Sequence, residues 1–262
     1  EAVDETPFDR FGPQPGDAPH TTQTTVGEHS SEQAHAEKPV TSDPIGGKIL
    51  RPEANAPLPL ENLKIVQENA NQHASQVSTL AELKEAMRQF EGCTLKRTAM
   101  NLVFGDGNPE SSIMFIGEAP GADEDRQGLP FVGRAGKKLT EIIEKGMNLD
   151  REKDTYICNI VKCRPPGNRD PEKEEIEACN PFLLQQLKAI QPKVVVALGN
   201  PAASTLLGRT VPITKERGTW HEYEGFKLML TLHPAYLLRA YTVENRKAVH
   251  NDMKMVLKEL GQ

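Results

Sequence analysis

The chain has 262 residues, with 31 lysine and arginine residues against 37 acidic residues and a formal net charge of −6. Its longest uninterrupted apolar stretch, Val194 to Leu198, is far shorter than the ~20 residues of a membrane-spanning helix. Four cysteines are too few for a disulfide scaffold, so we expect thiols kept in a reducing compartment and no membrane association.

The N-terminal part of the chain is acidic and rich in proline. Residues 1–79 hold twelve acidic and five basic residues, a net charge of −7, whereas residues 80–262 hold 25 acidic and 26 basic residues, a net charge of +1. Nine of the twenty prolines precede residue 60. Because such a segment cannot bury enough apolar surface to offset its ordering entropy, we predict a disordered tail over residues 1–60. Residues 61–77 are expected to form a linker or an N-terminal helix.

A folded domain is predicted over residues 78–262. Ser78 can cap a helix whose apolar stripe ends at Phe90. Strand-like runs follow at residues 112–117, 155–161, 193–199 and 226–232, and helical stretches at residues 135–146, 171–189, 201–207 and 243–260. Near-continuous apolar strands separated by helices predict an α/β fold with three αβα layers and a central, mostly parallel four-stranded sheet.

The distinctive motifs follow the predicted strands, where an open parallel sheet binds its ligands. They are GEAPGADEDRQGLPFVGRAG from Gly117, NIVKCRPPGNRDP from Asn159, LGNPAASTLLG from Leu198 and LHPAYLLR from Leu232. The first motif has neither the GxGxxG nor the GxxxxGK[ST] form, which disfavours a dinucleotide or Walker-type phosphate site.

Three side chains in these loops each allow two interpretations. Phe131 is either a core residue or a ring presented by a rigid loop between Pro130 and Gly133. Asn159, at the end of an apolar strand, is either a satisfied structural amide or a side chain aimed at a ligand. His233 is either structural or part of a site formed by neighbouring loops.

Taken together, GEAPG with PFVGRAG, NIVKCRPPGNR and HPAYLLR resemble the family 4 uracil-DNA glycosylases over about residues 90 to 260. The resemblance implies a monofunctional hydrolase of base-excision repair that flips uracil out of DNA, hydrolyses its N-glycosidic bond and leaves an abasic site. It also implies a cytoplasmic protein of bacterial type that acts on uracil-containing DNA as a monomer.

The resemblance carries roles over to individual positions. The uracil-binding residues it implies are Ala119, Phe131 and Asn159, with Phe131 as a stacking ring and Asn159 as the reader of the uracil edge. The catalytic residues it implies are Asn168, His233, Glu118 and Glu124. His233 would stabilise charge on uracil O2, and the carboxylates and Asn168 would stabilise the sugar or orient water.

Basic residues in the same loops are candidates for phosphate contacts. The DNA-binding residues we expect are Arg134, Lys162, Arg164, Tyr236, Leu237 and Arg239. The stretch Tyr236 to Arg239 is expected to be the loop that enters DNA and replaces the flipped base.

The cysteines match the family's pattern only in part. The family typically holds a [4Fe-4S] cluster through four cysteines, and Cys93, Cys163 and Cys179 occupy three of these positions. Phe90 stands in the fourth position and cannot ligate iron. Either a cluster forms with another ligand or an open iron site, or all four cysteines are small buried hydrophobes.

Two other functions remain open at this stage. The first is a non-catalytic DNA-binding module of the same fold, associated with replication or repair machinery. The second is an enzyme that acts on a free base or nucleotide. The presence of Phe131, Asn159, Asn168 and His233 together favours the glycosylase.

Overall fold

Six strands form a single sheet in the computed structural model, which describes residues 60–77 and 79–262. The strands are β1 (Asp106–Gly107), β2 (Ile113–Gly117), β3 (Thr155–Asn159), β4 (Val194–Leu198), β5 (Trp220–Tyr223) and β6 (Phe226–Thr231), in the order β1-β3-β2-β4-β6-β5. The helices are α1 (Leu60–Ser75), α2 (Leu80–Gln89), α3 (Ala122–Gln127), α4 (Arg134–Glu141), α5 (Lys173–Ile190), α6 (Gly199–Leu207), α7 (Ile213–Glu216), α8 (Pro234–Arg239) and α9 (Val243–Leu260), and short helical turns lie at η1 (Thr94–Arg97), η2 (Ile142–Gly146) and η3 (Pro166–Asn168).

The four predicted strands are the parallel centre of this sheet. They correspond to β2, β3, β4 and β6, which pair in parallel, and each is one or two residues shorter than its apolar run. Every residue of β2, β3 and β4 is buried, because helices cover both faces of the sheet. This burial explains why these strands read as continuous apolar runs in the sequence.

The predicted number of four strands was wrong, because two antiparallel edge strands complete the sheet. β1 has only two residues, which pair with β3 and carry no apolar pattern. β5 forms a hairpin with β6 and is partly exposed. Glu224 and Gly225 connect the two strands with φ of 51° and 83°, the left-handed backbone of a tight hairpin turn.

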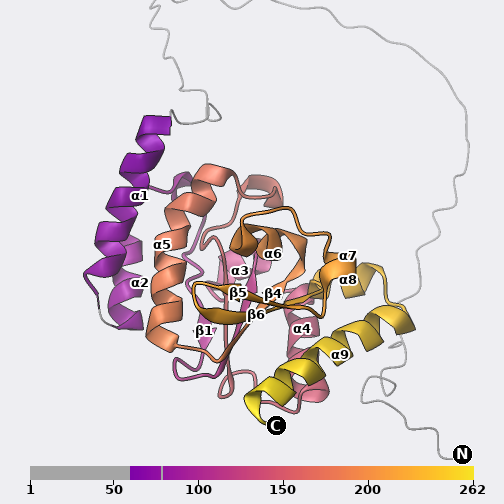
Figure 1. The fold of residues 1–262 in the computed structure, drawn as a ribbon. Helices are drawn as coiled ribbons and strands as arrows, with labels where there is room; N and C mark the ends of the chain where they lie inside the picture. Colours follow the sequence, from indigo (N-terminus) through magenta and orange to yellow (C-terminus); the bar gives the residue numbers. More distant parts are fainter. Residues whose placement is uncertain (1–59, 78) are drawn as a thin grey trace, which may run out of the picture. The chain divides into compact units, whose positions relative to one another are not determined.

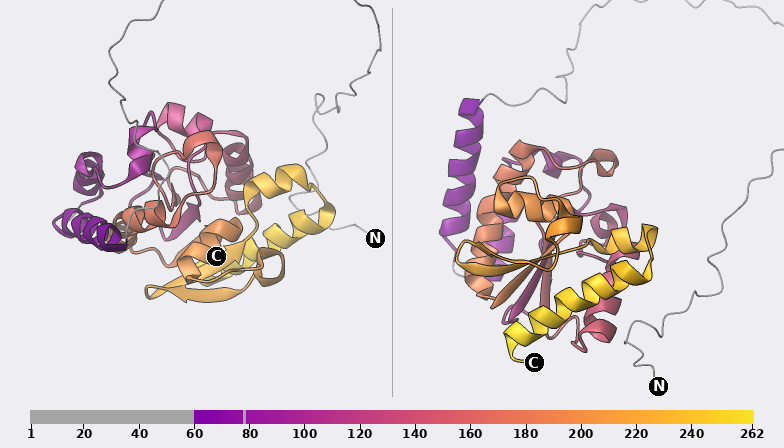
Figure 2. Two further views of the ribbon diagram at one scale, coloured as in Figure 1. Left: turned by 90° about the horizontal axis from the view of Figure 1, so that it is seen from above. Right: turned by 45° about the vertical axis from the view of Figure 1, so that its right-hand side comes forward.

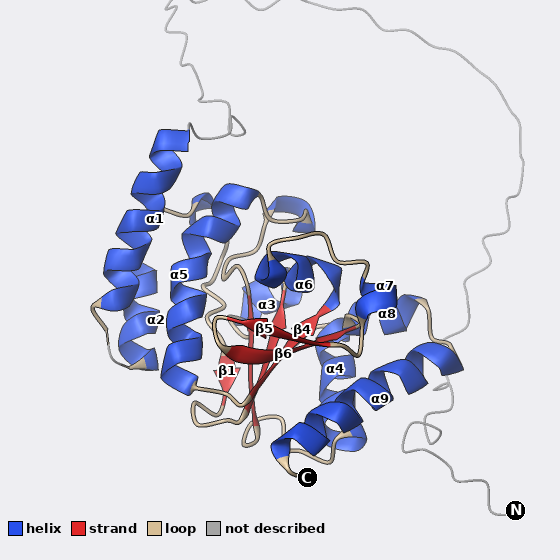
Figure 3. Ribbon diagram, viewed as in Figure 1, coloured by secondary structure: helices blue, strands red, loops and turns tan. Residues whose placement is uncertain are grey.

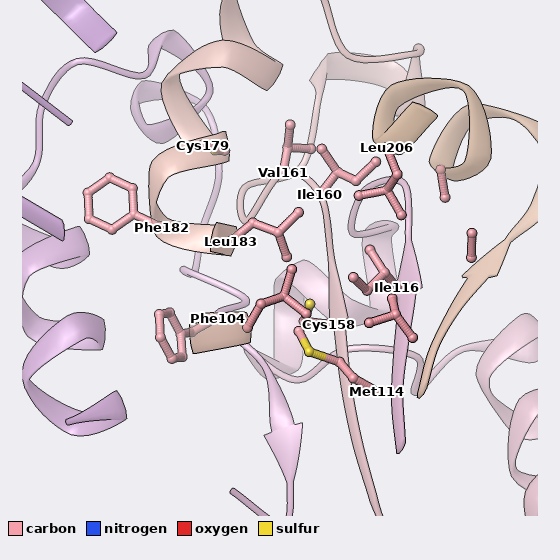
Figure 4. Packing of buried hydrophobic residues seen from close by; sticks show 14 of the residues in the cluster. Phe104, Met114, Ile116, Cys158, Ile160, Val161, Cys179, Phe182, Leu183 and Leu206 are labelled. Carbon is pink, nitrogen blue, oxygen red and sulfur yellow. The ribbon is translucent and has the colours of Figure 1, made fainter. Parts of the chain in front are cut away.

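Helices lie on both faces of the sheet, which confirms the three-layer αβα prediction (Figures 1 and 3). On one face, Leu183 of α5 and Leu206 of α6 pack over Ile116 and Cys158 of the sheet (Figure 4). On the other face, α9 contacts β4 and β6 (Figure 2). In the described ranges, no helix is long and apolar enough to cross a membrane.

The N-terminal helix α1 packs against α5 and α2, so the folded unit starts before residue 78. Within residues 61–77, for which a linker or an N-terminal helix was expected, the structure has α1 up to Ser75. The predicted cap, Ser78, and residues 1–59 of the predicted tail lie outside the described residues, whereas Leu60, the last residue of that predicted tail, begins α1. The observed cap of α2 is Thr79, whose Oγ1 accepts a hydrogen bond from the Glu82 backbone N–H (3.2 Å) while Glu82 Oε2 accepts one from the Thr79 N–H (3.1 Å).

Candidate active site

A cavity of about 650 Å³ opens where the parallel strands end. Its walls come from the segments after β2, β3, β4 and β6. It is lined by all of the predicted uracil-binding and catalytic residues, which are Glu118, Ala119, Glu124, Phe131, Asn159, Asn168 and His233. Of the predicted DNA-binding residues, Tyr236 and Arg239 line it, whereas Arg134, Lys162, Arg164 and Leu237 do not.

The floor of the cavity is formed by Asn159 and Phe131 around Gly117. Asn159 is 1% exposed, and its Oδ1 has no hydrogen-bond partner within the described residues. A Cβ on Gly117 would lie 2.5 Å from both Asn159 Oδ1 and Phe131 Cζ. The missing side chain at Gly117 therefore allows the amide and the ring to meet beside the strand end. A flat ligand with a hydrogen-bond donor on its edge would satisfy the buried oxygen.

Phe131 is held in an uncommon backbone conformation. Its φ is 53°, in the left-handed region that a bulky residue rarely adopts. The guanidinium of Arg151 donates to the carbonyl of Pro130 (2.8 Å) and to Thr140 Oγ1 (2.8 Å), which ties the loop to α4. Such strain persists only where the surroundings hold it, and it concentrates at functional sites.

His233 enters the cavity as the N-cap of α8. The backbone N–H of Ala235 donates to its Nδ1 (3.1 Å), so a neutral ring carries its proton on Nε2. Burial lowers the pKa of His233 to about 4; the charge of Arg239 acts in the same direction, and Glu124 opposes it. The imidazole is therefore neutral near pH 7 and offers Nε2–H as its donor.

Glu118 directly follows β2 and faces the cavity. Burial, and secondarily the charge of Asp170, raises the pKa of Glu118 to about 7. Asp170 lines the same cavity. A carboxyl group with a pKa near neutrality can exchange a proton at physiological pH, as a general base must.

Glu124 has a different environment, although it lines the same cavity. Its Oε1 accepts from the backbone N–H groups of Val132 (3.0 Å) and Gly133 (2.9 Å), and its Oε2 accepts from that of Gly121 (3.1 Å). Both carboxylate oxygens are thus engaged in joining the GEAPG turn to the Phe131 loop. This geometry assigns Glu124 to positioning the loop rather than to contact with reacting atoms.

Asn168 lies on the exposed rim of the cavity with φ of 57°. Its Oδ1 accepts a hydrogen bond from Nε of Arg164 (2.6 Å), so the arginine orients the amide. The amide nitrogen then remains available to donate towards the cavity.

The expectation that Lys162 contacts DNA conflicts with its burial. Lys162 is 0% exposed, and its Nζ donates to the backbone carbonyl of Asn159 (2.6 Å). A phosphate cannot reach this ammonium without unfolding the strand end. Lys162 instead holds the backbone that carries the Asn159 amide.

The predicted DNA-entering loop is the short helix α8. Leu237 is 1% exposed and packs inward, so it is not the side chain that could enter a duplex. Leu238 is partly exposed and Arg239 is exposed. Because consecutive residues of a helix point to different faces, Leu238 rather than Leu237 is the apolar side chain of α8 that could enter a duplex.

Three of the cysteines belong to the buried core that also contains Phe90. Cys93, Cys163 and Cys179 are each at most 5% exposed. A hydrogen bond to Cys179, together with burial, raises the pKa of Cys93, and burial followed by the charge of Cys93 raises that of Cys163 to about 12. No group of three or more His, Cys, Asp or Glu side chains in residues 60–77 and 79–262 is arranged to hold a metal ion.

Comparison with known proteins agrees with this geometry. Residues 104–254 match the model of the uracil DNA glycosylase superfamily. The type-4 uracil-DNA glycosylase of Thermotoga maritima is 46% identical over 175 residues, which cover 66% of this chain and 90% of that protein. Those of Saccharolobus solfataricus (43% over 188 residues, covering 68% and 85%) and Sulfurisphaera tokodaii (40% over 189 residues, covering 69% and 84%) are similar. The chain belongs to the type-4 uracil-DNA glycosylase family.

Several residues that shape this family member's site were not singled out from the sequence. Asp170 and Asn200 lie within the motifs that follow the strands but were given no role, and Arg151 lies outside those motifs. Gly199 has φ of +87°, and a Cβ there would lie 2.7 Å from His233 Cβ. The sequence feature that could have identified Gly199 is its position directly after an apolar strand, because ligand sites and close backbone approaches occur at such strand ends.

The two leucines of α8 provide a test of this arrangement through stability. Leu237→Ala should lower the free energy of unfolding by about 2 to 5 kcal/mol, because it empties a buried site. Leu238→Ala should cost less than about 1 kcal/mol, because its side chain is partly solvated. Urea unfolding followed by circular dichroism measures the free energy of unfolding of both variants. Equal losses of stability would contradict the arrangement in which Leu237 faces the core and Leu238 faces solvent.

Proposed function

We propose that this protein is a uracil-DNA glycosylase that hydrolyses the N-glycosidic bond of uracil in DNA and leaves an abasic site. The observation that carries the proposal is the buried, unpartnered Oδ1 of Asn159 beside Phe131 at the floor of the cavity. Family membership and the sequence motifs support the same function. A DNA substrate implies an intracellular enzyme, and we expect it to act as a monomer.

Base recognition follows from the hydrogen-bonding pattern of Asn159. Uracil offers a donor at N3–H and an acceptor at O4, which match the amide oxygen and nitrogen. Cytosine has an acceptor at N3 and a donor at the adjacent amino group, so it would leave the buried Oδ1 facing another acceptor. An unsatisfied buried polar group costs about 1 to 3 kcal/mol, and two mismatches would exclude cytosine efficiently. Phe131 supplies a face on which the flipped base stacks.

Bond cleavage is supported by groups on both sides of the scissile bond. As the C1′–N1 bond breaks, its electron pair passes to the base, and the Nε2–H of neutral His233 donates to the negative charge that develops on O2. Water attacks C1′ and gives its proton to Glu118, whose carboxylate also stabilises the positive sugar. Asn168, oriented by Arg164, holds the water.

Access to the base requires that its nucleotide leave the duplex. We expect phosphate contacts from Arg239, which lines the cavity, and from Arg134, since both side chains are exposed. Leu238 can fill the space that the flipped base leaves.

A uracil-containing oligonucleotide tests the function directly. The wild-type protein should generate alkali-sensitive sites at uracil and none at cytosine. His233→Ala should lower the single-turnover rate by about a hundredfold while DNA binding persists, since one oxyanion donor contributes on the order of that factor. Asn159→Asp should weaken uracil excision strongly, because a carboxylate cannot donate to O4.

Two outcomes of this assay would contradict the proposal. Folded protein that binds uracil-DNA without cleavage after alkali would identify a non-catalytic DNA-binding module. Unchanged uracil kinetics in Asn159→Asp would remove the amide from base recognition.

The raised pKa of Glu118 predicts a pH dependence. Since the base must be ionised, and its pKa lies at about 7, the single-turnover rate should rise about tenfold per pH unit below 7 and level off above it. His233, with a pKa of about 4, stays neutral throughout this range. Glu118→Gln should be slow and show a flat profile between about pH 5.5 and 9. A wild-type profile that is already flat from pH 5.5 would exclude Glu118 as the titrating base.

The buried Lys162 and the exposed Arg239 should differ in their salt dependence. Arg239→Ala should reduce the slope of log binding affinity against log salt by about one, as the loss of one phosphate contact does. Lys162→Met should leave that slope unchanged and reduce kcat/KM for uracil by about tenfold, because the backbone at Asn159 loses a charge-assisted hydrogen bond of roughly 1.5 to 3 kcal/mol. A reduced slope for Lys162→Met would instead place Lys162 on the DNA.

A further inference from the structure

The core around Cys93, Cys163 and Cys179 has an aromatic ring where the family pattern expects a fourth thiolate. Phe90 is 4% exposed, with its ring centroid 5.3 Å from that of Phe182 on α5. A Cβ on Gly92 would lie 2.3 Å from Phe90 Cζ, so the ring folds back over its own loop. The phenyl group thus fills space directly beside the loop that carries Cys93.

No other cysteine can take the fourth position. Cys158, the remaining thiol, is 0% exposed within β3 and lies beside Met114 on the face of the sheet (Figure 4). Burial raises the pKa of the Cys158 thiol, and the neighbouring Lys162 opposes this shift. An iron–sulfur cluster of the usual kind needs four thiolates, and the described side chains supply three. The residues present therefore do not fit the cluster.

The loop between α2 and η1 is held in place by an ammonium group instead. Lys96 Nζ donates to the carbonyl oxygens of Arg88 and Phe90 (3.1 Å for the latter) and pairs with Glu91 Oε1 (2.5 Å). These contacts join the end of α2, the Phe90 position and the following loop. Lys96 thus cross-links the end of α2 to the turn that follows Cys93.

The helix α1 closes the same region from outside. His73 meets the Phe90 ring edge-on at 5.7 Å between centroids. Ala70 and Ala74 of α1 are buried in the same core cluster as Phe90 and the cysteines. Apolar contacts of this kind stabilise the core without any ligand.

We propose that this glycosylase domain folds and is stable without an iron–sulfur cluster, because the Phe90 ring, packed between Phe182 and α1, closes the site and Lys96 fixes its loop. The thiols of Cys93, Cys163 and Cys179 act as small apolar side chains in this core. The proposal concerns iron content and stability, so it stands or falls independently of the excision assay.

Iron loading of the full chain tests the proposal. After anaerobic treatment with ferrous iron and sulfide and removal of excess reagent, the wild type should retain fewer than about 0.5 iron per chain and no visible absorbance near about 400 nm. Phe90→Cys restores four thiols and should approach about four irons per chain with that absorbance. Stoichiometric iron in the wild type would overturn the proposal. A Phe90→Cys protein that remains free of iron would show that Phe90 is not the group that excludes the cluster.

Thermal melting tests the role of Lys96. Lys96→Met should lower the Tm by about 5 °C, whereas the control Lys188→Met, at an exposed position of α5, should change it by less than about 1 °C. A metal chelator should leave the wild-type Tm unchanged. Equal effects of the two lysine variants would contradict the cross-link assigned to Lys96, and a fall in wild-type Tm with chelator would overturn the proposal that the domain is stable without a cluster.

Discussion

The active site depends on the empty position at Gly117. Parallel pairing of β2 with β3 sets Gly117 directly beside Asn159 at the end of the sheet. Because Gly117 has no side chain, the Phe131 ring can approach the Asn159 amide over the strand end. Any larger residue would occupy the volume of both groups. The same strand continues into Glu118, so one backbone segment positions the base-reading floor and the carboxylate.

The groups that hold this geometry are buried or partly buried and are separate from those assigned to the reaction. Glu124 joins two loops through backbone N–H groups, Arg151 holds the loop before Phe131, and Lys162 holds the carbonyl of Asn159. Each contact is a charge-assisted hydrogen bond, which is about twice as strong as a neutral one. They maintain the left-handed backbone at Phe131 and fix the amide before any ligand enters. Such preorganisation lowers the cost of ordering on binding.

The apolar pattern of the sequence predicted the parallel centre of the fold and the loops at its strand ends that line the cavity, whereas the individual site residues came from the resemblance of those loops to the family. It could not predict the edge strand β1, because two residues are too few to show an alternating pattern. Nor could it predict that Leu237 is buried while Leu238 is partly exposed, because this depends on how α8 packs. Lys162 was wrongly expected to contact DNA because a charged side chain is usually exposed, whereas its ammonium group is buried and donates a hydrogen bond to the backbone carbonyl of Asn159. Residue type and loop position thus indicate candidate chemistry, and only packing decides which candidates are accessible.

The distribution of charge around the cavity matches the charges that develop in glycosidic cleavage. Glu118 and Asp170 bring negative potential to the cavity, and burial first, then repulsion by the charge of Asp170, raises the pKa of Glu118. A positive sugar between them would relieve that repulsion, so the interaction strengthens as the bond breaks. Burial, and after it the charge of Arg239, disfavours protonation of His233 and keeps it a neutral donor for the leaving base. The chain's net negative charge, which resides in residues 1–79, therefore does not describe the surface that meets DNA.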